Sequence, residues 1–142
     1  MVRAAWCLLL IALSGAATGT AAAATRYDPR LKFSTISTRR FDIHFHQREE
    51  ALARRLAGFI EAAADGVDAA VGAAVGRVQV ILVDQHDLSN GWATPVPYNT
   101  IEITVAAPPS GDSIGNTSDW LRLVFVHEYT HVAHLSRAGG GR

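Results

Sequence analysis

The sequence predicts an α+β fold, in which a small twisted mixed sheet packs on one long helix and on a second helix near the carboxyl end. Residues 41–46 alternate apolar and polar side chains, as a half-buried strand does. Residues 47–74 repeat apolar side chains every three or four positions, as an amphipathic helix does. The 142 residues are 49% hydrophobic and 18% charged, which suits one compact domain.

Residues 1–24 have the composition of a signal peptide. Arg3 supplies a positive charge, residues 4–13 form an apolar core, and small residues follow as far as Ala24. This core of about ten residues is shorter than the roughly 20 that a membrane-spanning helix needs. We therefore expect cleavage before Thr25, no stable membrane span in the mature chain, and export to the periplasm, cell envelope or extracellular space. An uncleaved membrane anchor is the alternative.

Cysteine content and charge restrict the chemistry. The single cysteine, Cys7, lies in the leader, so the mature chain has neither a disulfide framework nor a thiolate zinc site. A metal ion would have to be held by histidine or carboxylate side chains. The formal net charge is +0 and no run of Lys or Arg is present, so we do not expect nucleic acid as a partner.

The first strand is expected at residues 41–46. Its apolar side chains, Phe41, Ile43 and Phe45, lie on one face, and the polar side chains lie on the other. Residues 25–40, before this strand, show no period and are expected to form an irregular leading segment.

A long helix is expected to follow, from Gln47 to about Ala74. Glycine costs a helix about 1 kcal/mol relative to alanine, so Gly66 is a candidate for a break. Gly76 is the expected stop.

Three further extended segments come next. Residues 78–83 form an almost continuous apolar run, as expected for a strand that is covered on both faces. Residues 91–94 are expected to form a brief extended segment that ends at Pro95 and Pro97, because prolines at this density belong at a sheet edge or in a turn. Residues 101–105 alternate as a further strand.

The last helix is expected from Asp119 to about Ser136. Ser118 is its expected N-cap, after a loop rich in proline, glycine, serine and asparagine. The glycines at 139–141 are expected to end it.

This last helix carries an H-E-x-x-H motif formed by His127, Glu128 and His131. Residues four apart lie on one face of a helix about 6 Å from each other, so the two imidazoles can converge on one zinc ion. Glu128 is set about 100° further round the helix, where its carboxylate reaches a water on the metal and can act as a general base. The alternative is a pair of surface histidines beside an unrelated glutamate.

The motif predicts zinc-assisted hydrolysis. Zinc would lower the pKa of a water ligand to about 7, and Glu128 would take the proton and pass it to the leaving amine. Catalytic zinc sites use three protein ligands, whereas the motif supplies two. His134 is the only nearby candidate, but it lies about 10.5 Å along the helix axis from His127, so a polar or supporting role fits it better.

The motif and its neighbouring segments carry a resemblance to a known family. They are residues 90–95, 97–99, 120–122, 126–132 and 134–135. In them the chain resembles the gluzincin zinc metallopeptidases, and more narrowly the exported bacterial proteins of the peptidase MA-like group. The resemblance implies that residues 25–142 form the amino-terminal part of a zincin-like domain.

The resemblance also implies roles for individual residues. His127 and His131 would hold zinc, with Glu128 as catalytic base. An edge strand would bind the backbone of a peptide or protein substrate by strand addition. We assign that role to Gly91, Trp92, Ala93 and Thr94, with residues 101–105 as the runner-up.

In such families the third ligand is a glutamate on a later helix. We therefore expect further domains beyond Arg142, and we expect residues 25–142 to be inactive by themselves.

Two other functions remain open. The chain could be a non-catalytic envelope or extracellular binding module that keeps a peptidase fold, or a globular domain with an incidental motif. Among the remaining histidines, His44 and His46 share one strand face and suit either a two-point metal site or a polar surface. His86, with Asp84 and Asp87, suits either a cation site or a hydrophilic loop.

Overall fold

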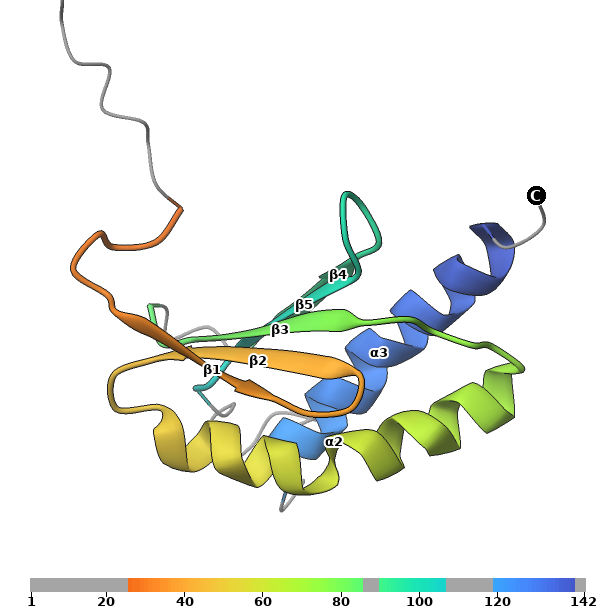
Figure 1. Cartoon of the computed structure of the whole chain (residues 1–142), viewed down its shortest axis with the longest axis horizontal. Coiled ribbons are helices and arrows are strands. Elements are labelled where there is room, and N and C mark those ends of the chain that lie inside the picture. Colours follow the sequence, from red (N-terminus) through yellow and green to blue (C-terminus); the bar gives the residue numbers. More distant parts are fainter. Residues whose placement is uncertain (1–25, 86–89, 107–118, 140–142) are drawn as a thin grey trace, which may run out of the picture.

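The computed structural model describes residues 26–85, 90–106 and 119–139, and these residues form an α+β fold of five strands and two helices (Figure 1). The predicted fold class is confirmed at this level. The expected signal peptide, His86, Asp87 and the expected N-cap Ser118 lie outside the described residues. No helix in the described ranges is both long and apolar enough to cross a membrane.

The sheet is mixed, with strand order β1-β2-β3-β5-β4. Three neighbouring strands are parallel: β2 (Phe41–His46), β3 (Val78–Val83) and β5 (Thr100–Thr104). The two outermost strands, β1 (Phe33–Ser37) and β4 (Gly91–Thr94), pair antiparallel with their neighbours. Helix α2 joins β2 to β3, as a parallel pair of strands requires a long crossover connection.

The core lies between the sheet and the two helices. The predicted apolar face of β2 is confirmed, because Phe41, Ile43 and Phe45 are all buried. Strand β3 is completely buried on this side at Val78, Val80 and Leu82. Its other side is only partly covered, which corrects the expectation of a strand buried on both faces.

Helix α2 runs without a break from Glu50 to Val71. It passes through Gly66, which has open space around it, and ends at Gly72 in the left-handed conformation with φ 69°. The helix therefore has no break at the candidate position Gly66, and the expected stop at Gly76 was wrong. Burial of the apolar face of α2 outweighs the roughly 1 kcal/mol that an exposed glycine costs.

Helix α3 extends from Trp120 to Gly139, three residues beyond the predicted end at Ser136. The side chain of Asp119 accepts a hydrogen bond from the backbone N–H of Arg122 at 3.2 Å, so Asp119 acts as the N-cap.

Strand β1 lies within residues 25–40, which were predicted to be an irregular leading segment. It pairs with β2 in the register Thr35 opposite His44. Four of its five side chains are exposed, so it presents no apolar face that a sequence pattern could reveal. Its place in the fold comes from backbone pairing with β2.

The face of the sheet away from the helices is polar. Both ring nitrogens of His44 are engaged there, Nδ1 with Thr35 Oγ1 at 2.8 Å and Nε2 with Gln79 Oε1 at 2.7 Å. His46 is 6% exposed, so it does not face solvent as the alternation suggested. The structure does not combine these two histidines into a metal site, because His44 is held by hydrogen bonds instead.

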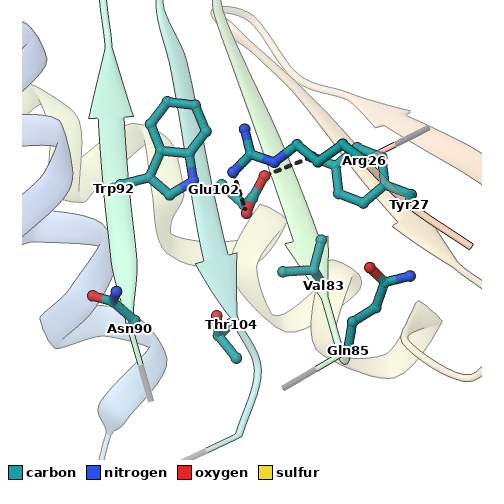
Figure 2. Close-up of a pocket in the computed structure, with 8 residues that line it drawn as sticks. All are labelled: Arg26, Tyr27, Val83, Gln85, Asn90, Trp92, Glu102 and Thr104. Atoms are coloured by element: carbon teal, nitrogen blue, oxygen red, sulfur yellow. Dashed lines mark hydrogen bonds and ion pairs between the residues drawn. The ribbon is translucent and has the colours of Figure 1, made fainter. Parts of the chain in front are cut away.

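The segment before β1 crosses this polar face and binds to β5 (Figure 2). Arg26 Nη2 lies 2.9 Å from one carboxylate oxygen of Glu102, and the hydroxyl of Tyr27 donates to the other at 2.5 Å. The guanidinium of Arg26 also lies over the ring of Trp92, at 4.4 Å from its centroid. The negative charge of the buried Glu102 is therefore compensated by a segment that lies far from it in the sequence.

Candidate metal centre

The two histidines of the motif converge on the exposed side of α3. The Nε2 atoms of His127 and His131 are 3.2 Å apart, and their ring planes are inclined by 81°. With zinc–nitrogen distances of about 2.0 to 2.1 Å, two ligands of a tetrahedral site are separated by about 3.3 Å. The pair therefore fits one metal ion. The same separation also permits a hydrogen bond when one ring carries the Nε2 proton.

Glu128 lies beside this pair but is buried, with 6% of its surface exposed. Burial raises the pKa of its carboxyl group, and the electrostatic influence of the neighbouring His127 and His131 acts in the opposite direction. Within the described ranges the carboxylate has no hydrogen-bond partner. The motif thus combines two accessible imidazoles with a largely buried carboxylate.

A cavity of about 680 Å³ lies along α3 at the motif. Its polar lining includes His127, Glu128 and His131. Its apolar lining includes Trp120 and Leu123, two residues that the sequence gave no reason to place in a site. Polar and apolar side chains in one cavity suit a ligand that has both polar and apolar groups.

His134 lines the same cavity and is exposed. It does not join the pair as a third ligand, because no group of three or more His, Cys, Asp or Glu side chains in the described parts of the chain is arranged to hold a metal ion. This agrees with the rise of the helix, which separates His134 from His127 by about 10.5 Å.

Strand β4 is an edge of the sheet and lies against α3. Strand β5 is interior, between β3 and β4, so the runner-up edge at residues 101–105 is excluded. Side chains of β4 alternate: Gly91 and Ala93 lie toward α3 and the core, whereas Trp92 lies toward Glu102 on the polar face. By the same alternation Thr94 lies on the polar face.

The hydrogen-bond register shows which backbone groups of β4 are free. Thr104 N–H donates to Asn90 O at 2.9 Å, so Asn90 and Thr104 form a hydrogen-bonded pair. In an antiparallel ladder such pairs alternate, and residues 91 and 93 therefore direct their backbone groups away from β5. The N–H of Gly91 donates to the side chain of Asn90 at 2.9 Å. The outward groups left at this edge are the carbonyl of Gly91 and both groups of Ala93.

No family model, no curated protein and no solved structure matches the chain.

Proposed function

We propose that the chain is the amino-terminal part of an exported zinc metallopeptidase that hydrolyses peptide bonds. His127 and His131 are the metal ligands, and Glu128 is the general base. The observation that carries the proposal is the 3.2 Å separation of the two Nε2 atoms on an accessible helix face, beside a buried carboxylate.

The surroundings of the motif support a peptide as substrate. An antiparallel edge strand lies against the motif helix, which is the arrangement expected of a zincin-like domain. A peptide that adds to β4 finds the carbonyl of Gly91 and the backbone groups of Ala93 available for pairing. Since Gly91 also touches Glu128, a peptide bond paired at this point lies close to the proposed base.

A zinc ion held by the two histidines would supply the Lewis acidity that makes a water molecule nucleophilic near neutral pH. Glu128 takes a proton from the attacking water and donates it to the departing amine. Burial raises the pKa of the Glu128 carboxyl group above its ordinary value, which favours proton uptake and so suits a group that acts as a base.

The third ligand is proposed to be a carboxylate outside the described residues, because no group of three or more His, Cys, Asp or Glu side chains within them is arranged to hold a metal ion. The same observation supports the alternative function, a non-catalytic envelope or extracellular binding module. The two functions differ in whether the full-length protein cleaves peptides, with Glu128 required for that cleavage.

Metal binding is tested by titrating the purified chain with Co²⁺ as a spectroscopic substitute for Zn²⁺. We expect His127→Ala and His131→Ala to abolish the His-dependent absorption, whereas His134→Ala, the matched control, retains it. Equal binding by His131→Ala and the wild type would contradict the metal assignment.

Catalysis is tested with the full-length protein and denatured casein. Glu128→Gln should keep the metal and lose proteolysis. Continued cleavage by Glu128→Gln would refute its role as base, and metal binding without cleavage by the wild type would favour the binding module.

A further inference from the structure

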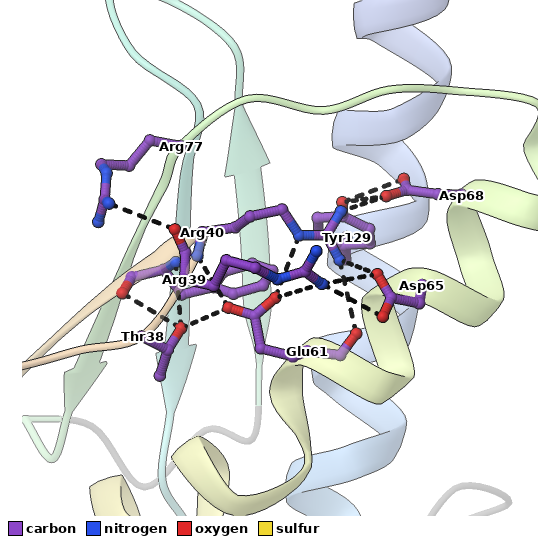
Figure 3. A network of polar contacts seen from close by, with 9 residues as sticks. Thr38, Arg39, Arg40, Glu61, Asp65, Asp68, Arg77 and Tyr129 are labelled. Atoms are coloured by element: carbon purple, nitrogen blue, oxygen red, sulfur yellow. Dashed lines mark hydrogen bonds and ion pairs between the residues drawn. The ribbon is translucent and has the colours of Figure 1, made fainter.

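Tyr129, a residue inside the motif, is bound to a carboxylate of the other helix (Figure 3). Its hydroxyl lies 3.0 and 3.1 Å from the two carboxylate oxygens of Asp68, in the last turn of α2. Tyr129 is fully buried, and its ring stacks on Phe125 with centroids 5.5 Å apart. A phenylalanine would fill the same apolar space, so packing alone does not account for the hydroxyl.

Asp68 is itself held in place. Arg40 Nη1 donates to Asp68 at 2.5 Å, and only 18% and 13% of the two side chains are exposed. Arg40 in turn binds Glu61 at 3.1 Å and Asp65 at 2.6 Å. Because Arg40 directly precedes β2, this network connects the sheet to α2 and, through Tyr129, to α3 (Figure 3). Side chains that are connected by several hydrogen bonds and ion pairs in this way restrict one another's movement.

Tyr129 lies on the side of α3 opposite the two histidines. Successive helical residues advance by about 100°, so a residue two positions from His127 and from His131 is about 200° around the axis from each. Rotation of α3 about its axis would therefore move the phenol hydroxyl and the imidazoles in opposite directions. The hydrogen bond between Tyr129 and Asp68 opposes that rotation.

We propose that Asp68 is a positioning residue for the motif: through Tyr129 it sets the rotation of α3 that turns His127 and His131 toward the cavity and lays Glu128 on β4. The consequence for metal binding rests on the proposed function, whereas the rotation of α3 does not. A hydrogen bond of defined geometry selects one orientation among those that apolar packing alone allows.

The rotation is measured by NMR on the 142-residue chain. Tyr129→Phe removes only the hydroxyl, and Asp68→Asn keeps the size of the acceptor while removing its charge. We expect both to weaken the NOEs between the α-protons of Gly91 and the side chain of Glu128. Asp65→Asn is the matched control, since Asp65 also binds Arg40 but does not contact Tyr129. Unchanged NOEs in a folded Tyr129→Phe chain would overturn the proposal.

Metal affinity supplies the second readout. Residues that orient metal ligands typically change affinity by about tenfold or more when removed. We expect a loss of that order for Co²⁺ in Tyr129→Phe and Asp68→Asn, with an altered visible spectrum, and a change within about twofold in Asp65→Asn. A lower melting temperature with unchanged NOEs and Co²⁺ affinity would reduce the network to a stabilising role and overturn the proposal.

The two proposals fail separately. A wild-type chain that binds no Co²⁺, or binds it equally after His131→Ala, contradicts the proposed function. The NOE comparison between Tyr129→Phe and Asp65→Asn then still decides whether Asp68 sets the rotation of α3.

Discussion

Gly91 lies directly against Glu128, because β4 crosses α3 at a residue without a side chain. A Cβ atom at position 91 would stand 2.9 Å from Cγ and 3.0 Å from Oε1 of Glu128, and 2.6 Å from Cγ2 of Val124. Such distances are shorter than the separation of about 3.5 to 4.0 Å at which carbon atoms pack. Gly91 therefore sets how closely the edge strand approaches the motif helix.

Gly91→Ala is expected to force β4 and α3 apart. Overpacking of this kind costs about 1 to 3 kcal/mol of unfolding free energy, which urea denaturation measures. Gly58→Ala is the matched control, because nothing lies within 4 Å of an added Cβ there, and it is expected to stabilise α2 by up to about 1 kcal/mol. Equal stability of Gly91→Ala and the wild type would show that the strand and helix adjust without cost.

In the full-length protein, Ala93→Pro is expected to lower kcat/KM toward denatured casein while leaving the fold intact. It removes the amide hydrogen that points away from β5, and a lost hydrogen bond of about 1 to 3 kcal/mol corresponds to a loss of about fivefold to a hundredfold. Thr94→Pro is the comparison, since by the register it removes a ladder hydrogen bond and is expected to lower stability instead. An unchanged kcat/KM in Ala93→Pro would exclude strand addition at β4.

The carboxylate of Glu61 is expected to make stability fall in acid. Burial alone would raise the pKa of Glu61, but hydrogen bonds from Thr38 and from the backbone and side chain of Arg40 outweigh it and lower the pKa from 4.5. A lowered pKa in the folded state means that the contribution of Glu61 is complete above about pH 4.5 and is lost as the pH falls through the folded value.

Glu61→Gln tests this dependence by urea unfolding at several pH values. We expect the variant to be less stable than the wild type at neutral pH, and the difference to shrink below about pH 4.5. Glu50→Gln is the control, because it removes only an exposed pair with Arg54 and should change stability by less than about 1 kcal/mol. A difference that grows in acid would contradict the assignment.

The hydrogen bond between Tyr27 and Glu102 gives a test on the alkaline side. Burial, and then the hydrogen bond and charge of Glu102, raise the pKa of Tyr27 from 10.0 to about 12. A raised pKa means that the contribution is present below about pH 10 and is lost as the pH rises toward 12. Tyr27→Phe should be less stable by about 1 to 3 kcal/mol at neutral pH, with the difference shrinking above pH 10.

Arg26→Ala is the companion variant for the same contact. We expect a smaller loss of about 0.2 to 1 kcal/mol, because more than half of the Arg26 side chain is exposed. The near-ultraviolet circular dichroism of Trp92 should also change, since the guanidinium lies over its ring. An unchanged tryptophan signal would show that Arg26 does not rest on Trp92 in solution.

Patterns in the sequence predicted the elements that have one strongly apolar face. Strand β2 and helix α2 were predicted because Phe41, Ile43 and their counterparts on α2 repeat at the periods of a strand and a helix. Strand β1 was missed because Phe33 and most of its neighbours are exposed on both faces. A strand that is held mainly by backbone pairing and by polar side-chain contacts leaves no apolar period in its sequence.

The same division applies to the candidate site. The convergence of His127 and His131 follows from helix geometry and could be predicted from their spacing. The contacts of Gly91 with Glu128 and of Asp68 with Tyr129 could not, since each depends on how distant elements pack. Asp68 and Tyr129 are 61 positions apart, and neither residue type reveals its partner.

The brevity of β4 limits what can join the sheet. It ends at Thr94, and Pro95 and Pro97 follow, so no backbone N–H is available at those two positions for a longer ladder. An exposed edge is otherwise a template on which copies of a protein stack into fibres. The prolines interrupt the long backbone ladder that the stacking of further copies requires, so pairing at this edge is limited to short strands.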